Sequence, residues 1–267
     1  MFETQKIRNG ITRIVYPGKV CGYYLEGTEQ GILLDTGCGY GDLKEFVDGI
    51  SRKPYVVVLS HGHVDHAGGA GQFPQVYLNE KDWKLAQEHT QKKIRKDYLI
   101  SNDVQAEDAL LTEPAKKFLP LHDGQNFDLG GLHVQFISLP GHTPGSMAMF
   151  VPEERIMLLG DACNSATFLQ LPGCLSVSAY RKALEIFDEK TAGRYDTVLY
   201  SHPHNSGGPE IVPEMIALCK EIEKNPQFGF QVPMPQWPGA YLAMPVDQTM
   251  HRKDGKAANL FYQPQNV

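Results

Sequence analysis

The sequence has few cysteines and no apolar run long enough to cross a membrane. Its five cysteines are scattered over 267 residues, their number is odd, and none forms a CxxC pair. Such usage argues against a disulfide framework and favours reduced thiols. The first ten residues, MFETQKIRNG, also lack the apolar core of an export signal. These absences lead us to expect a cytoplasmic protein without a membrane segment.

An excess of positive charge is missing too. The chain carries 25 basic and 31 acidic residues, a net charge of −6, which disfavours a broad nucleic-acid-binding face. It contains no internal repeat and no low-complexity linker. With 42% hydrophobic residues, a chain of this length can bury a substantial core. We therefore predict one domain over residues 1–267.

Short apolar runs alternate with helical patterns along most of the chain. Runs at 10–18, 19–27 and 30–37, broken by Gly and Pro, predict a β-meander. Residues 40–50 follow with helical spacing and with Asp42 as N-cap, and 54–60, PYVVVLS, reads as a central buried strand. The segment 67–73 is expected to open a helix. Further strands are predicted within 75–79, 132–141, 146–152, 155–161 and 195–202, and further helices at 178–190 and 212–225.

Two segments differ from this pattern. Residues 79–118 are helical in character and predict an insertion, which could cap one edge of the domain or pack against a second subunit in a homodimer. The basic residues of this insertion are expected to form a solvated helix face: Lys92, Lys93, Arg95 and Lys96. Residues 226–267 predict a Pro-rich C-terminal extension with a closing strand at 257–263. Ser178 is the candidate N-cap of the helix that follows it.

Imidazole and carboxylate side chains follow the apolar strands. The residues just past the strand ends are Asp35; His61, His63, Asp65 and His66; His142; Asp161; and His202 with His204. Histidine nitrogens and aspartate oxygens suit Zn²⁺ and related divalent metals, and no cysteine belongs to the set. Four such donors within residues 61–66 cannot all bind one ion without strain. The pattern therefore predicts two adjacent metal ions.

The segment HGHVDH at 61–66 resembles the HxHxDH signature of the metallo-β-lactamase superfamily. LLDTG, PGHTPGS, LLGDAC and LYSHPH stand around it in the order typical of that family. The resemblance implies an α/β (α+β) fold: a four-layer αββα sandwich of two mixed β-sheets flanked by helices. It also implies metal ligands, with His61, His63 and His142 on a first ion, Asp65, His66 and His202 on a second, and Asp161 bridging both. Zinc is the expected metal, with iron or manganese as alternatives.

Other residues near these segments have two interpretations. His202 is preferred over His204 as the last ligand because it follows its strand directly. Asp35 is expected to brace a loop through hydrogen bonds, and Cys163 to be a small buried residue. Four aromatic residues could belong either to the core or to a substrate pocket: Trp83, Phe168, Tyr180 and Trp237.

The resemblance points to a hydrolase of the glyoxalase II-like or acyl-lactonase-like branch. In such an enzyme a hydroxide held by two metal ions attacks an ester, thioester or lactone carbonyl, and Asp65 is the candidate catalytic residue that orients it and passes a proton to the leaving group. The extension does not resemble a helical glutathione-binding domain, which argues against glutathione thioesters. The expected partner is a small-molecule substrate. Alternatives are a persulfide dioxygenase with one iron ion, a phosphodiesterase or RNA-processing nuclease, and a non-enzymatic metal-bound scaffold.

Overall fold

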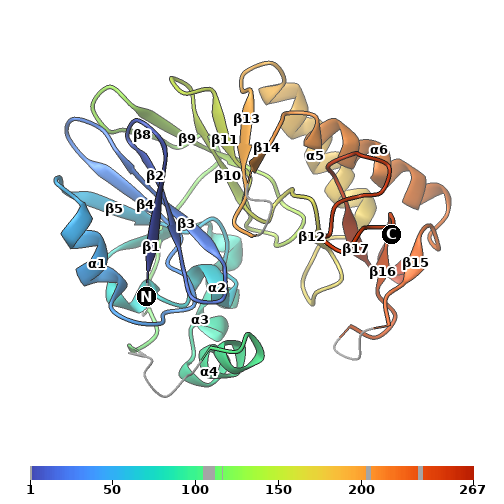
Figure 1. The fold of residues 1–267 in the computed structure, drawn as a ribbon, viewed down its shortest axis with the longest axis horizontal. Helices are drawn as coiled ribbons and strands as arrows, with labels where there is room; N and C mark the ends of the chain where they lie inside the picture. The colour runs from blue at the N-terminus through green and yellow to red at the C-terminus, as the bar shows by residue number, and fades with distance from the viewer. Residues whose placement is uncertain (1, 105–111, 116, 203–205, 234–236) are drawn as a thin grey trace.

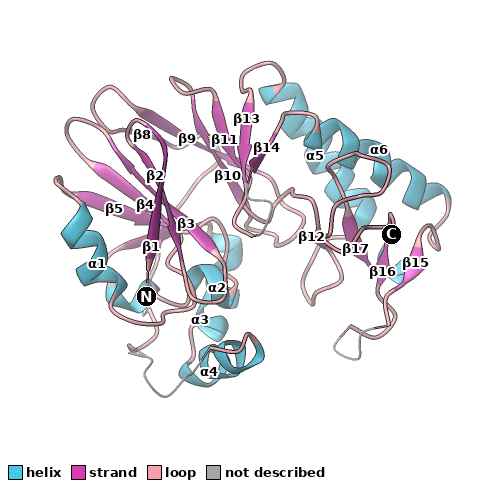
Figure 2. Ribbon diagram, in the orientation of Figure 1, coloured by secondary structure: helices cyan, strands magenta, loops and turns pink. Residues whose placement is uncertain are grey.

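Two large β-sheets lie face to face, and helices cover their outer faces (Figure 1). The computed structural model describes residues 2–104, 112–115, 117–202, 206–233 and 237–267. Across the molecule, helix α1 (Leu43–Ile50) is followed by the first sheet, the second sheet, and then helices α5 (Val177–Thr191) and α6 (Ile211–Lys224) (Figure 2). The predicted four-layer αββα sandwich is confirmed.

The first sheet contains seven strands in their chain order. Strands β1 to β4 are antiparallel, as the β-meander prediction requires, and β4 to β7 are parallel. Strand β5 lies between β4 and β6 and is the predicted central strand. The strands are β1 (Glu3–Arg8), β2 (Ile11–Val15), β3 (Cys21–Glu26), β4 (Gly31–Leu34), β5 (Tyr55–Val58), β6 (Val76–Leu78) and β7 (Leu119–Pro120).

The second sheet has six strands in the order β14-β13-β11-β10-β9-β8. Its strand β10 (Met147–Val151) is buried at every position. Met147, Met149 and Val151 pack into the core between the sheets, whereas Ala148 and Phe150 face the layer of helices α5 and α6. This alternation follows from the two-residue period of a strand covered on both faces. The other strands are β8 (Asn126–Asp128), β9 (His133–Ser138), β11 (Ile156–Leu158), β13 (Thr197–Leu199) and β14 (Ser206–Gly207).

Side-chain caps fix where the helices begin. Asp42 accepts a hydrogen bond from the Glu45 amide at 2.8 Å and is the N-cap of α1, as predicted. The cap of α5 is Ser176, which accepts from the Ala179 amide, so the prediction of Ser178 was wrong. Ser178 already lies in the first turn of α5, where it cannot precede the helix that it would cap.

A third, four-stranded sheet, not predicted from the sequence, adjoins helices α5 and α6. Its order is β12 (Thr167–Phe168), β17 (Leu260–Tyr262), β16 (Tyr241–Leu242) and β15 (Phe230–Gln231). Strand β17 falls where the closing strand was expected, and it pairs in parallel with β12. Most of the extension at 226–267 therefore packs beside the second sheet's helices, followed by a short 3₁₀ turn, η3 (Pro264–Asn266).

The region 79–118 supplies a 3₁₀ turn η2 (Glu80–Asp82) and helices α3 (Trp83–His89) and α4 (Lys92–Ser101). Arg95 of α4 is fully buried, so its assignment to a solvated face was wrong. Its guanidinium donates to the carbonyl oxygens of Cys38 (3.2 Å), Gly39 (2.9 Å) and Thr112 (2.8 Å). These acceptors satisfy the buried charge and tie α4 to the loop after β4.

The segment 67–73 forms less helix than expected. Helix α2 (Val64–Ala67) ends as the segment begins, and only the 3₁₀ turn η1 (Ala70–Gln72) follows. Gly68 and Gly69 disfavour a longer helix, because glycine has a low helix propensity. Glycine is needed at both positions, where an added Cβ would meet a carbonyl oxygen at 2.5 and 2.4 Å. In the described part of the chain, no helix has both the length and the apolar character to cross a bilayer.

Candidate metal centre

The seven predicted ligands lie in two groups at one edge of the two large sheets. His61 and His63 stand in the turn after β5, and Asp65 and His66 are in the short helix α2. The others follow strands β9, β11 and β13. One group is His61, His63 and His142, and the other is Asp65, His66, Asp161 and His202. In each group the potential ligand atoms all lie within 4.8 Å of one another.

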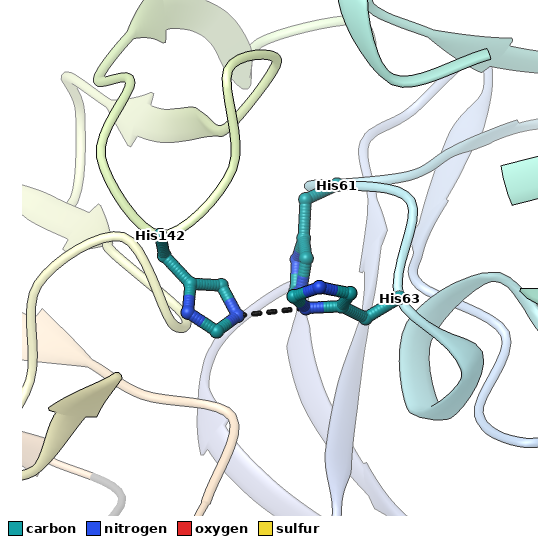
Figure 3. A group of neighbouring side chains, drawn as sticks. All are labelled: His61, His63 and His142. Carbon is teal, nitrogen blue, oxygen red and sulfur yellow. Dashed lines mark hydrogen bonds between the residues drawn. The ribbon is translucent and has the colours of Figure 1, made fainter. Parts of the chain in front are cut away.

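The first group consists of three buried imidazoles. His63 Nδ1 lies 3.1 Å from His61 Nε2 and 2.9 Å from His142 Nε2. Figure 3 shows that His142 reaches this point from a separate loop, with its ring nitrogen aimed at His63. Burial disfavours the charged imidazolium and lowers the pKa of all three rings. The rings are therefore neutral, which is the form that binds metals.

The second group combines two carboxylates with two imidazoles. Asp161 Oδ2 lies 3.0 Å from His202 Nε2 and 3.3 Å from His66 Nε2, and Asp65 Oδ2 lies 3.4 and 3.6 Å from the same two atoms. Asp161 Oδ2 is also 3.8 Å from His142 Nε2, which belongs to the first group. Asp161 is therefore the residue that faces both groups.

Opposite charges within the second group stabilise one another. Burial alone would lower the pKa of His202, but Asp161 and Asp65 raise it to about 10. The same carboxylates and Asp35 raise the pKa of His66. Burial also opposes the ionisation of Asp161, but His202 and His66 more than offset it and hold its pKa well below the usual range. A metal that binds this group must therefore displace protons from His202 and His66.

The ring nitrogens that point away from the centre are held by fixed partners. His61 Nδ1 lies 3.0 Å from Ser60 Oγ, and His142 Nδ1 lies 2.8 Å from the Phe168 carbonyl oxygen. His66 Nδ1 lies 2.9 Å from Asp35 Oδ2. The Asp35 carboxylate also accepts from the amide and hydroxyl of Ser60, at 2.7 and 2.8 Å. Asp35 therefore braces the loop as expected, and these contacts fix which nitrogen of each ring faces inward.

The donor set fits a divalent metal. His66 Nε2 and Asp161 Oδ1 are buried and have no hydrogen-bond partner among the described residues. Buried polar atoms seldom remain unsatisfied, and three neutral imidazole nitrogens converging near 3 Å leave lone pairs that a cation would satisfy. Nitrogen and oxygen donors without a thiolate suit zinc and similar metals.

Asp82, which the sequence reasoning missed, connects the two loops that carry the first group. This fully buried carboxylate accepts from the Gly62 amide at 2.9 Å, the Gly145 amide at 2.8 Å and the Thr143 hydroxyl at 2.6 Å. Gly62 lies between His61 and His63, and Thr143 follows His142. The residue belongs to the turn η2, and no local pattern marks it because its three donors come from distant segments.

Two more residues of the region 79–118 reach the centre. The His89 ring stacks on that of His63, with centroids 5.2 Å apart and planes inclined by 26°. Tyr98 donates a hydrogen bond of 3.4 Å to Asp65 Oδ2. Helices α3 and α4 thus border the site directly. This position agrees with the prediction that the region caps one edge of the domain.

Two cavities begin at the metal-site side chains. The larger has a volume of about 910 Å³ and the smaller about 360 Å³. Both are bordered by His142, Asp161 and His202, and both touch Phe168. Trp237 lines the larger cavity, so two of the four aromatic candidates border a cavity.

The remaining predicted residues have structural roles or fall outside the description. Tyr180 is buried and donates to the Ala162 carbonyl oxygen at 2.6 Å, and Trp83 packs on the core next to the first sheet. Cys163 is fully buried, as expected. His204 lies outside the described residues, so its comparison with His202 stays a prediction.

The family model of the metallo-beta-lactamase superfamily matches residues 16–202 of this chain. This stretch contains the seven side chains of the two groups. The chain belongs to the metallo-beta-lactamase superfamily. Members of this superfamily use divalent metals, typically zinc, and the protein is accordingly assigned as a metallohydrolase.

Curated relatives within the superfamily include thioester-cleaving enzymes by name. The human acyl-coenzyme A thioesterase MBLAC2 is 22% identical over 218 residues, covering 71% of this chain and 75% of its own. The hydroxyacylglutathione hydrolase GloC of Haemophilus influenzae is 25% identical over 147 residues, 53% of this chain and 65% of its own. An atrochrysone carboxyl ACP thioesterase of Emericella nidulans is 28% identical over 149 residues, 54% of this chain and 40% of its own.

Solved structures agree on the fold. A metallo-beta-lactamase from Pontibacter korlensis superposes with a TM-score of 0.59 at 18% identity, covering 82% of this chain and 99% of its own. The sec-alkyl sulfatase PisA1 superposes with a TM-score of 0.61 at 16% identity, covering 85% of this chain and 42% of its own. At these identities the likeness establishes the superfamily fold.

Proposed function

We propose that the protein is a two-ion hydrolase that cleaves an ester, thioester or lactone at its carbonyl carbon. The supporting observation is the pair of adjacent donor groups joined through Asp161 Oδ2, which is 3.8 Å from His142 Nε2 and 3.0 Å from His202 Nε2. One ion would be held by the three imidazoles of the first group, the other by the second group, with Asp161 between them. Zinc is the first candidate, and iron and manganese are the alternatives.

When bound, two divalent ions supply Lewis acidity and lower the pKa of a coordinated water to about 7. The residue proposed to handle the proton is Asp65. Its Oδ2 faces His202 and Tyr98, and its side chain borders the larger cavity. Asp65 can thus orient the attacking water and transfer a proton to the leaving atom. A thiolate leaves without that proton, whereas an alkoxide requires it.

Thioesters are the first substrate class to test. By name, the three relatives described above are an acyl-coenzyme A thioesterase, a hydroxyacylglutathione hydrolase and an ACP thioesterase. What these named activities share is the bond cleaved, and their thiol carriers differ. We therefore propose a small-molecule acyl thioester as substrate and no nucleic-acid partner, in keeping with the net charge of −6.

Metal content and turnover are to be measured on the same purified sample. We expect two zinc-type ions per chain and release of free thiol from acyl thioesters. Asp161→Ala should lose at least one ion and the turnover, because it removes the carboxylate shared by both groups. Asp123→Ala is the matched control, since Asp123 is a half-exposed carboxylate paired with Lys190 outside both cavities.

Three results would contradict the proposal, each in favour of a different function. One iron ion per chain with oxygen consumption on a persulfide would identify a dioxygenase. Cleavage of bis-nitrophenyl phosphate without thioester hydrolysis would identify a phosphodiesterase. A metal-loaded protein that is inert to every ester, thioester, lactone and phosphodiester would be a scaffold.

A further inference from the structure

The two cavities at the metal centre differ in the chemistry of their walls. The larger one extends along helices α3 and α4, and its polar lining includes Lys81, Lys84, Ser101 and Asn102. The smaller one extends under the C-terminal extension, and its lining includes Ala166, Phe168, Tyr200 and Met250. A substrate whose reactive carbonyl lies at the centre can extend into both.

The wall of the smaller cavity has an apolar part beside polar residues such as Asn164, Ser165 and Gln248. Ala166 and Phe168 pack against an apolar cluster formed by Val232, Leu242 and Phe261. The Phe168 ring also contacts Trp237 and Phe261 edge-on, with centroids 5.0 and 5.1 Å away. These contacts hold Phe168 in place, so the cavity has a rigid aromatic wall.

Asn164 and Thr249 in this wall direct their hydrogen-bonding groups elsewhere, whereas the buried Tyr200 hydroxyl has no hydrogen-bond partner among the described residues. Asn164 Oδ1 accepts from the Ala166 amide at 2.8 Å, and its Nδ2 donates to the Gly160 carbonyl oxygen at 3.2 Å. Thr249 Oγ1 donates to Asp247 Oδ1 at 2.7 Å. Because these bonds are made within the protein, Asn164 and Thr249 require nothing from an occupant, and a hydrocarbon chain fits beside them.

A braced turn of the C-terminal extension completes the wall. Asp247 Oδ1 accepts from the amides of Thr249 (2.7 Å) and His251 (3.1 Å). The next wall residue, Met250, has a left-handed backbone with φ of 65° and a side chain that is 42% exposed. A left-handed backbone costs free energy at a residue other than glycine, and such strain concentrates at ligand clamps.

We propose that the smaller cavity binds the acyl chain of the substrate and that the larger cavity binds its polar thiol carrier. The assignment rests on the proposed thioester hydrolysis. In that reaction water adds its oxygen to the carbonyl carbon and the C–S bond breaks. One proton of the water ends on the departing thiolate and the other passes to solvent, so a carboxylate and a thiol are released. The two substituents of the carbonyl thus need separate places, and the apolar substituent matches Ala166 and Met250, which line the smaller cavity but not the larger one. Lys81 matches an anionic carrier, and Lys84, which lies 3.9 Å from Glu88, borders the same cavity.

A series of thioesters that share one thiol, from acetyl to decanoyl, tests the assignment through kcat/KM. Each buried methylene should raise kcat/KM about fourfold, the equivalent of about 0.8 kcal/mol, until the cavity is full. Ala166→Phe should lower the decanoyl-to-acetyl ratio at least tenfold, and Ala166→Leu should have an intermediate effect. Ala166 is only half-buried, so the larger side chains are compatible with folding.

Two further substitutions serve as comparisons. Leu171→Phe narrows the larger cavity and should leave the decanoyl-to-acetyl ratio unchanged. Ile186 lies on α5, is 54% exposed and borders neither cavity. Ile186→Phe should therefore leave all kinetic constants unchanged. A flat chain-length series, or a ratio that responds to Leu171→Phe and not to Ala166→Phe, would overturn the assignment.

Binding of 1-decanol, measured by titration calorimetry on the metal-loaded protein, separates this inference from the proposed reaction. We expect wild type to bind the alcohol and Ala166→Phe to bind it at least tenfold more weakly. Binding of this kind without thioester hydrolysis would leave the apolar cavity in place and reject the proposed reaction. Equal binding by the two proteins would reject the acyl cavity even if thioesters are hydrolysed.

Discussion

Replacing Asp82 tests whether one buried carboxylate positions the first metal-binding group. Asp82→Ala removes the acceptor shared by the Gly62 and Gly145 amides and by the Thr143 hydroxyl. Thr143 keeps a partner, because its hydroxyl also lies 2.8 Å from Ser146 Oγ. The two buried amides lose their acceptor.

The expected loss follows from those two amides. Each buried donor left unsatisfied costs about 1–3 kcal/mol. Burial raises the pKa of Asp82, which means that the folded state already bears a cost for this charge, so the net loss should fall at about 2–4 kcal/mol. For a chain of this size that lowers Tm by about 5–12 °C. Asp82→Ala also removes the hydrogen bonds that hold the two loops carrying the three imidazoles. Zinc affinity at these imidazoles should therefore fall by about 10- to 100-fold.

The raised pKa gives a second, pH-dependent signature. With its raised pKa, the folded Asp82 carboxyl keeps its proton to a higher pH than the unfolded one does. Its contribution to stability therefore declines as pH rises from the usual aspartate pKa of 3.8 through the raised pKa. Asp82→Asn, which keeps one acceptor and has no charge, should remove this decline. Its loss of stability near pH 7 should be smaller than that of Asp82→Ala.

The assay is a competition titration of zinc against a chromophoric chelator, with thermal unfolding of the metal-free protein measured in parallel. Asp123→Asn is the control, because Asp123 also accepts a backbone hydrogen bond, from Ser138 at 2.8 Å, but lies outside both cavities. Unchanged zinc affinity in Asp82→Ala would refute the reasoning, and so would an equal loss of zinc affinity at both metal-binding groups. So would a Tm within 1 °C of wild type, by the magnitude estimated above.

Three further predictions concern other parts of the molecule. Arg95→Met should lower the free energy of unfolding by about 2–4 kcal/mol in denaturant titrations, because two buried carbonyl oxygens and one partly buried one lose their donor; a loss below about 0.5 kcal/mol would contradict the tie between α4 and the β4 loop. Burial raises the pKa of Cys163 and of Cys174 to about 12, so both thiols should react with a disulfide reagent at pH 8 only after unfolding, and rapid native labelling of either would contradict this. The pKa of His202, about 10, and the raised pKa of His66 mean that both are protonated without metal; zinc binding at pH 8 should release about two protons and strengthen as pH rises, and a binding enthalpy independent of the buffer would exclude that release.

Much of the fold and the site could be predicted because both depend on local patterns. Strand β5 is a continuous apolar run, and a strand buried on both faces has that composition wherever it occurs. The side chains that follow such strands meet at one sheet edge, which is why His61, His142 and Asp161 could be grouped before their distances were known. The resemblance to a known superfamily supplied the pairing into two groups.

The errors and omissions have a common physical origin in long-range contacts. A run of charges predicts a solvated helix face, but Arg95 is buried because backbone carbonyls of two other segments accept its hydrogen bonds. The strands of the third sheet have only two or three residues, too few for a two-residue period to be seen. Asp82 and Tyr98 act on loops far away in the sequence, so neither is distinguished by its neighbours.

The parallel pairing of β12 with β17 has a consequence for how the protein is made. Strand β12 follows Asp161 closely, but its partner is synthesised roughly 90 residues later, which is a long contact to close. On the ribosome, the metal-binding side chains up to His202 are complete well before the residues that cover Phe168 emerge. A nascent chain at that stage would expose the apolar wall around Phe168. Expression of a protein truncated before residue 260 should therefore yield aggregates rather than a folded hydrolase that accepts only short acyl chains.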